Sequence, residues 1–359
     1  MNQTVEKVFP PGRALVVTER WLGSNAFAMM KALRRKGWNV NDLCEKEYIP
    51  LRWESKMMKA IGRALRYAAT REFNRALLKA ARRHTPDMFL VFKGAHVQAG
   101  TIRALQARGA RALCVYPDVS FYAHGRYLPQ ALPAYDWIFT TKTFGLADMR
   151  AQLGITRASV IPHAADADLH RPTSLNDRDR ADFACEVSFI GTWSPKKERI
   201  LTDVVTRLPQ LRLKVFGGQW DRVPAASPLR PFLAGYPVYS LDYVKAICGS
   251  KINLGILSEA RIGSSSGDQI TSRTFHIPAC GGFLLHERTE ELLQVFEEDR
   301  HVACFGDADE LSKKISYYLD RDEDRQRISA AALAEVSGKH TWDKRIDEVM
   351  SKYTEMAEK

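Results

Sequence analysis

The chain contains 359 residues, of which 45% are hydrophobic and 26% are charged, with 53 Lys and Arg against 42 Asp and Glu. This composition is typical of a folded protein of two or three domains and excludes an intrinsically disordered chain. No stretch approaches the ~18 consecutive apolar residues of a membrane span, and the N-terminus lacks the apolar core of a secretory signal. Six widely spaced cysteines without a C-x-x-C pair argue against a zinc site and a disulfide scaffold. We therefore expect a cytoplasmic protein without a metal site.

The positive charge is concentrated in the first half of the chain. Residues 1–172 contain 27 Lys and Arg and 13 Asp and Glu, a net charge of +14, whereas the remaining residues carry a net charge of −3. This asymmetry indicates an anionic partner for the first half: a phospholipid surface, a phosphorylated glycan or a nucleic acid.

Short β-rich apolar runs alternate with segments of helical periodicity through the first half. The predicted strands cover residues 13–18, 38–43, 87–92, 111–116, 136–140 and 159–162. Helices are predicted over residues 26–36, 53–84, 98–107 and 143–153. This alternation favours right-handed crossovers and a doubly wound parallel sheet.

A polar segment, residues 173–182, is predicted to be a linker, and the alternation then begins again. Strands are predicted at 186–190, 211–216, 251–257, 283–285 and 301–305. Helices are predicted after Pro195, near 241–248, from Thr271-Ser272, twice within 307–337, and from Thr341. We therefore expect two α/β domains, residues 1–172 and 173–340, that face each other across a cleft. A C-terminal helix, 341–359, would pack back on the first domain.

The stretch Ser264–Gly282 carries the clearest chemical signal. A Ser- and Gly-rich loop leads to a helix start at Ser272, with Arg273 in the first turn. Free backbone N–H groups at a helix N-terminus, the helix dipole and an adjacent guanidinium can bind a diphosphate without a metal. The alternative is an ordinary capped crossover with a solvated Arg273.

This stretch also resembles a known family. The run from Ser272 to Gly282, SRTFHIPACGG, is similar to the nucleotide-sugar loop of retaining glycosyltransferases of family 4 (group 1), and most similar to the CgeB-like, spore-maturation type. The resemblance extends to residues 136–140, 161–172 and 187–193. It implies the GT-B fold, with two Rossmann-like domains, and a glycosyltransferase that uses a nucleotide-sugar, retains anomeric configuration and needs no metal or other cofactor. The second domain would bind the donor, and the first the acceptor.

The resemblance and the glycine turns together give the donor-binding candidates. These are Gly191, Thr192, Lys197, Arg199, Gly217, Gly218, Ser272, Arg273, His276, Gly281 and Gly282. His276 stands where the family has a Glu that holds the ribose, and Thr192 where it has an Arg. Asp268 stands at the other acidic position and would hold hydroxyls of the transferred sugar. An altered acidic pair leaves open a nucleotide-binding protein without transferase activity.

The acceptor-side candidates follow predicted strand ends of the first domain. Gly23 and Lys93 would lie near the acceptor, and His163 would face the cleft at the domain crossing. Asp118 and His96 are candidate catalytic groups that could hydrogen-bond or deprotonate the acceptor hydroxyl. The alternative for each is a strand-end cap. The acceptor would be a glycan, a lipid-linked molecule or a protein, as in cell-envelope or polysaccharide biosynthesis.

The predicted helix near residues 52–83 carries a basic stripe. Its cations are Arg52, Lys56, Lys59, Arg63, Arg66, Arg71, Arg75, Lys79, Arg82 and Arg83. A second stripe is apolar: Trp53, Met57, Ile61, Leu65, Ala69, Phe73 and Leu77. The helix is either a solvated face over a core or a peripheral contact with an anionic membrane on its inner side. A transferase that modifies nucleic acid is a further alternative, but aromatic residues are not interleaved with the cations as base stacking requires.

Overall fold

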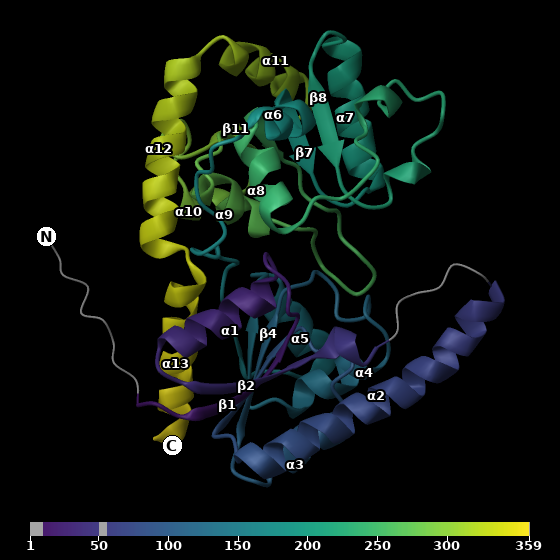
Figure 1. Cartoon of the computed structure of the whole chain (residues 1–359), viewed down its shortest axis with the longest axis vertical. Helices are drawn as coiled ribbons and strands as arrows, with labels where there is room; N and C mark the ends of the chain where they lie inside the picture. Colours follow the sequence, from purple (N-terminus) through teal and green to yellow (C-terminus); the bar gives the residue numbers. More distant parts are fainter. Residues whose placement is uncertain (1–9, 50–55, 359) are drawn as a thin grey trace, which may run out of the picture. The chain divides into compact units, whose positions relative to one another are not determined.

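The computed structural model describes residues 10–49 and 56–358, with side chains from Leu65 onward in the helix that begins at Lys56. The chain divides into two compact units (Figure 1). Unit 1 comprises the chain up to Pro162, Arg261–Ser266 and Trp342–Lys359. Unit 2 comprises His163–Ala260 and Gly267–Thr341. The division therefore falls after Pro162, before the predicted linker.

Unit 1 contains a parallel sheet with the order β2-β1-β3-β4-β5-β6. Its strands are β1 (Arg13–Thr18), β2 (Asn39–Cys44), β3 (Met88–Phe92), β4 (Arg111–Tyr116), β5 (Trp137–Thr140) and β6 (Ala158–Val160). The connecting elements are α1 (Asn25–Arg35), η1 (Glu45–Glu47), α2 (Lys56–His84), α3 (Ala99–Gln106), α4 (Tyr127–Ala131), η2 (Leu132–Ala134) and α5 (Gly145–Leu153). The central strands are almost entirely apolar because helices cover both faces of a doubly wound sheet.

Long helix α2 packs on unit 1 through its C-terminal part. Phe73 and Leu77 are fully buried in the core, as the apolar stripe predicts. Leu65 departs from that prediction, because it is 44% exposed. Of the other predicted stripe residues, Arg52 and Trp53 lie outside the described residues. The structure describes only the backbone of Lys56, Met57, Lys59, Ile61 and Arg63.

Helix α13 (Trp342–Ala357) belongs to unit 1 although it ends the chain. Trp342 is buried, and its Nε1–H donates to Oδ1 of Asn25 at 3.1 Å. Arg35 of α1 pairs with Asp343 at 2.7 Å. These contacts bind the two helices to each other, so a segment remote in sequence completes the unit.

Unit 2 contains a parallel sheet with the order β11-β10-β9-β7-β8. Its strands are β7 (Cys185–Ile190), β8 (Leu213–Phe216), β9 (Ser250–Gly255), β10 (Leu284–Glu287) and β11 (Ala303–Phe305). Its helical elements are α6 (Asp177–Phe183), α7 (Pro195–Arg207), η3 (Trp220–Arg222), η4 (Arg230–Phe232), α8 (Ser240–Cys248), α9 (Ser272–Ala279), α10 (Glu290–Val295), α11 (Ala308–Leu319) and α12 (Asp322–Lys339). None of the described helices is long and apolar enough to span a membrane.

The predicted linker is wrong in part, because it contains most of α6. Asn176 caps this helix: its side chain accepts a hydrogen bond from the Asp179 N–H at 2.8 Å, and Asp179 completes a capping box. Phe183 anchors the helix in the core of unit 2. The polar composition of this segment resembles that of a linker. In a helix, however, acidic residues of the first turn are stabilising because they interact with the positive end of the helix dipole.

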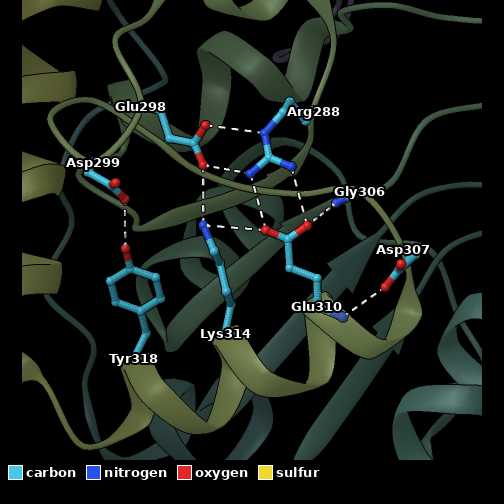
Figure 2. Close-up of polar contacts among 8 residues, drawn as sticks. All are labelled: Arg288, Glu298, Asp299, Gly306, Asp307, Glu310, Lys314 and Tyr318. Carbon is cyan, nitrogen blue, oxygen red and sulfur yellow. Dashed lines mark hydrogen bonds and ion pairs between the residues drawn. The ribbon is translucent and has the colours of Figure 1, made fainter.

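A network of four charged side chains follows β10 in unit 2 (Figure 2). Arg288 contacts Glu298 at 2.9 Å and Glu310 at 3.1 Å, and Lys314 lies 3.2 Å from Glu298. The pKa values of Glu298 and Glu310 are lowered below the ordinary value, mainly because each carboxylate accepts a hydrogen bond from Arg288. The network joins α11 to the segments before β11 and after β10.

We predict that Arg288→Met lowers the stability of unit 2 by about 1–2 kcal/mol near neutral pH, since it leaves two carboxylates facing one lysine. The lowered carboxyl pKa values mean that this stabilisation is present above about pH 5 and is lost as pH falls through them. Denaturant unfolding from pH 7 to pH 3 should therefore show the two proteins converging in acid. Arg300→Met, which removes an exposed pair with Glu297, is the control and should change little. A constant difference across this pH range would contradict the prediction.

Candidate functional site

The candidate donor site of unit 2 lies where its strands end. Loops that follow parallel strands gather at the carboxyl edge, where ligands of open α/β sheets bind. Gly191 follows β7, and β10 ends at Glu287. Because α9 leads back into β10, its N-terminus at Ser272 also lies at this edge. A capping box between Thr271 and Thr274 fixes that start, with the Thr271 N–H donating to the Thr274 hydroxyl at 3.0 Å.

Arg273 ties three elements together at this edge. Its Nη1 donates to the carbonyl of Ile190 at the end of β7, and its Nη2 to the carbonyl of Ile256 just after β9, each at 2.8 Å. The guanidinium lies over the ring of Phe189, 5.2 Å from the ring centroid. Its Nε–H is buried and finds no hydrogen-bond partner among the described residues. A guanidinium carries five N–H groups, so Arg273 retains N–H groups that could donate hydrogen bonds to an anion.

This packing requires glycine directly after β7 and directly after β8. A Cβ on Gly191 would collide with Nη1 of Arg273, and a Cβ on Gly217 would collide with the carbonyl oxygen of Gly191. Gly217 also has a φ of +147°, which L-residues rarely adopt. Gly218 differs, because a Cβ there would meet nothing within 4 Å. Of the three, only Gly218 therefore has open space beside it for a ligand.

Two lysines at the start of α7 bring positive charge to the same edge. Lys197 is buried, and its Nζ donates to the Thr192 carbonyl at 3.2 Å and to the Ser258 hydroxyl at 2.9 Å. Lys196 pairs with Glu287 at 2.5 Å. The side chain of Thr192 is exposed, so only its backbone takes part here.

His163 lies at the beginning of unit 2, beside the start of α9. It was expected on the acceptor side, but it is the first residue of unit 2. Its Nδ1 lies 3.1 Å from the Ser272 hydroxyl at the start of α9, and the side chain is buried. His163 therefore belongs to the donor-side cluster.

His276 is a packed residue of unit 2. Its Nε2 lies 3.2 Å from the carbonyl oxygen of Ala164, and its ring stacks on His170 with centroids 3.8 Å apart. Burial, and secondarily the charge that His170 can carry, lower the pKa of His276 well below its ordinary value. The imidazole is therefore neutral near pH 7, and one of its two nitrogens is occupied by the backbone.

The remaining donor-side candidates are spread out. Gly281 and Gly282 follow the C-terminal end of α9, away from Ser272, and a Cβ on Gly282 would come within 2.7 Å of Ile247. They serve the packing of α9 and are not brought together with its N-terminus. Arg199 is exposed on α7, beside a surface cavity that Trp193 also lines. Asp268 is half-exposed, and its charge acts on Arg273.

Asp118 lies in a cluster of charges in unit 1. Its Oδ2 contacts Lys93 Nζ at 2.9 Å and His124 Nε2 at 2.8 Å. Burial alone would raise the pKa of Asp118, but the hydrogen bond from His124 and the charge of Lys93 outweigh it and hold the pKa below its usual range. A carboxylate stabilised in this way is a weak base, and it is better suited to hydrogen bonding than to deprotonation.

His96 lies in a second cluster of unit 1. Its Nδ1 is 2.6 Å from Oε1 of Glu45, which follows β2. Asn74 of α2 donates to the His96 carbonyl at 2.8 Å and so fixes this segment. The structure therefore separates the two predicted catalytic groups of unit 1 into different clusters. Gly23, with a φ of +97°, lies in the turn between β1 and α1.

Sequence reasoning missed Glu45, His124, Glu259 and Glu287. Glu287 ends the short strand β10, and the Lys196 N–H donates to Glu259 at 2.7 Å. Each of the four follows or ends a predicted strand, which is the signal that could have found them. Nowhere in the described residues do three or more His, Cys, Asp or Glu side chains form a group that could hold a metal ion.

We predict opposite results for the neighbouring glycines. Gly217→Ala should lower the stability of unit 2 by about 2 kcal/mol or more, because it combines a strained φ with a backbone collision. Gly218→Ala, the matched control, should leave stability unchanged and reduce only the affinity for a ligand that approaches this turn. Thermal unfolding and nucleotide titration of both variants would decide this. Equal stability of the two would refute the packing role of Gly217.

Comparison with known proteins identifies the fold. Residues 196–351 match a family described as glycosyl transferase-like. Sucrose-phosphate synthase from Thermosynechococcus elongatus superposes with a TM-score of 0.64 at 12% identity, over 96% of this chain and 99% of that one. HepE of Anabaena, solved with UDP, gives a TM-score of 0.58 at 12% identity, over 95% and 100%. A Listeria monocytogenes protein designated a UDP-N-acetylglucosamine 2-epimerase gives 0.58 at 10% identity, over 97% of each chain.

No curated protein sequence matches the chain. The neighbours and the two parallel sheets confirm a two-domain Rossmann-like architecture of the GT-B type. The glycosyl transferase-like match covers residues 196–351, and the structural neighbours, all at 10–12% identity, show the fold.

Proposed function

We propose that the protein transfers a sugar from a nucleotide-sugar donor to an acceptor, and that the donor binds at the carboxyl edge of the unit 2 sheet. The main support for this proposal is that the N-terminus of α9, Arg273 and the buried Lys197 lie together at this edge. Backbone N–H groups, a helix dipole and two cations form the chemistry that a diphosphate requires. The glycosyl transferase-like match over residues 196–351 includes Lys197, Arg273 and the whole of α9.

A uridine nucleotide is the proposed donor carrier. HepE has been solved with UDP and with UDP-glucose, and it shares the fold of this chain. Arg273 and Lys197 would stabilise the charge that develops on the leaving diphosphate, and Asp268 would hold hydroxyls of the sugar. The neutral His276 offers the ribose fewer acceptor positions than a carboxylate would, so we expect modest nucleotide affinity.

The finer features remain proposals that rest on the sequence resemblance. They are a CgeB-like subtype, retention of anomeric configuration, and catalysis without a metal. In a retaining transfer the bond from the anomeric carbon to the diphosphate oxygen breaks, and the acceptor oxygen forms its bond on the same face. The acceptor proton then passes to the leaving diphosphate, whose negative charge the cations of unit 2 balance.

The acceptor would bind unit 1. The ionised Asp118 would hydrogen-bond an acceptor hydroxyl, and the Glu45–His96 pair is the alternative acceptor-side group. We also propose peripheral contact with an anionic membrane at the exposed part of α2. Leu65 and Tyr67 are 44% and 49% exposed there, and Arg71 lies beside Tyr67. Apolar and cationic side chains together are typical of interfacial helices.

A nucleotide panel tests the donor proposal. UDP and UDP-sugars should raise the unfolding temperature more than nucleosides do, since a ligand that binds only the folded chain stabilises it. Each UDP-sugar that binds should then be hydrolysed slowly or transferred to an added glycan. Conversion to an epimer without loss of UDP would instead indicate an epimerase, the activity designated for one structural neighbour. Binding without any turnover would leave a nucleotide-binding protein.

We predict that Arg273→Met weakens UDP binding by about 1.5–3 kcal/mol and changes uridine binding little, since the guanidinium would contact only the diphosphate. The variant also leaves two carbonyl groups without donors, so its overall stability should fall. The ratio of UDP to uridine affinity, measured by titration of folded protein, separates these effects. Arg212→Met, an exposed change at the start of β8, is the control. Equal losses for UDP and uridine would exclude phosphate contact by Arg273.

A further inference from the structure

A groove of about 600 Å³ lies in unit 1 between β2, η1 and the C-terminal half of α2. The residues that matter for its chemistry are Asn41, Asp42, Tyr48, Arg75, Lys79 and Arg83. β2 is the edge strand of its sheet, so the groove follows an edge that α2 only partly covers. It is separate from the clusters around Asp118 and His96, although η1 borders both the groove and the second cluster.

The acidic side chains of the groove are largely neutralised within unit 1. Asp42 accepts from Arg20 at 2.6 Å and from Arg34 at 2.9 Å. Glu47 pairs with the same Arg20 at 2.8 Å. Glu72 is the exposed carboxylate that remains at the lining. An anion in the groove would therefore meet few uncompensated negative charges.

The cations of α2 are in the opposite situation. Arg75, Lys79 and Arg83 follow one another at intervals of four residues, so they form one row on the helix, roughly 12 Å long. All three are exposed, and none forms an ion pair within the part of the chain that the structure describes. Three unpaired cations in a row match an extended ligand that carries several negative charges.

The other lining groups suit a carbohydrate. Tyr48 is half-buried and held against Phe73 with ring centroids 5.5 Å apart, so its ring is a fixed apolar surface beside the groove. Asn41 adds an amide that can both donate and accept hydrogen bonds. We propose that this groove binds an anionic glycan, a chain of sugars bearing carboxylate, sulfate or phosphate groups. This inference rests on the proposed function and adds the chemical class of the acceptor. The glycan would be the acceptor itself or a longer chain that carries the acceptor sugar.

The shape of the site favours a glycan over the other anionic partners. A flat membrane cannot follow cations that line a recess. A nucleic acid strand binds such proteins through bases stacked on successive aromatic rings, and Tyr48, the one Tyr, Phe or Trp side chain in the described lining of the groove, does not form a series of base-stacking platforms. A glycan with one charge per sugar can meet the spaced cations and place an apolar ring face on Tyr48.

The test measures binding of labelled hexagalacturonate and sulfated maltohexaose to the full chain, with neutral maltohexaose for comparison. The groove variant Arg75→Gln/Lys79→Gln/Arg83→Gln should bind both anionic probes at least about tenfold more weakly. The control Arg82→Gln/Arg103→Gln/Arg108→Gln removes three exposed cations of unit 1 outside the groove lining and should change affinity less than about twofold. Binding should weaken with added salt but persist near about 150 mM.

Several results would overturn the inference. These are equal losses in the two triple variants, binding of neutral maltohexaose as tight as that of the charged probes, and no binding of either anionic probe. Tighter groove-dependent binding of a single-stranded oligonucleotide, or of vesicles containing phosphatidylglycerol, would assign the groove to those partners. Vesicle binding through the exposed part of α2 should instead respond to Arg66→Glu with Arg71→Glu.

The donor measurements keep this inference apart from the proposed function. Both triple variants lie in unit 1 and should keep the stabilisation by UDP that the native chain shows. A protein that binds hexagalacturonate through the groove but ignores every nucleotide would refute the donor proposal and leave the groove assignment standing. A protein that turns over UDP-sugars but binds no anionic glycan would do the reverse.

Discussion

The guanidinium of Arg273 is the contact on which the carboxyl edge of unit 2 depends. It donates to carbonyl groups after β7 and β9 from the first turn of α9, so one side chain fixes three elements. A partly buried guanidinium needs hydrogen-bond acceptors, because burying a charge without partners is costly, and these two carbonyl groups supply them. Gly191 leaves it room, and Gly217 in turn leaves room for the carbonyl of Gly191. The phosphate-binding chemistry proposed for this edge uses the donors that remain.

In unit 1, half-buried carboxylates are neutralised by nearby cations. Asp118 is held ionised by Lys93 and His124, and Asp42 is held between two arginines. Arg75, Lys79 and Arg83 have no ion-pair partner among the described residues, so part of the basic surplus of the first half lies along α2. A net charge that composition describes only as a total thus becomes a row of cations beside a groove.

The fold alone does not determine which reaction the protein catalyses. Its structural neighbours include a sucrose-phosphate synthase and a protein designated an epimerase, all at low sequence identity. One architecture can host different reactions, so the activity must be argued from the side chains at the strand ends. Arg273 and Lys197 would suit the diphosphate of any nucleotide-sugar, so the proposal of transfer rests on the glycosyl transferase-like region. His276, packed on His170, departs from the acidic pattern of the resembling family.

The sequence by itself determined the alternation of strands and helices, because apolar periodicity and caps are local signals. It also located the helix start at Ser272 with Arg273. Only the tertiary structure decided that Leu65 is exposed, that α6 interrupts the predicted linker, and that His163 joins α9. Pairings such as Glu45 with His96 join residues far apart in the chain, and no local pattern encodes them. Which charges are neutralised and which stay open to a ligand depends on such long-range contacts, so it emerges only when the chain is folded.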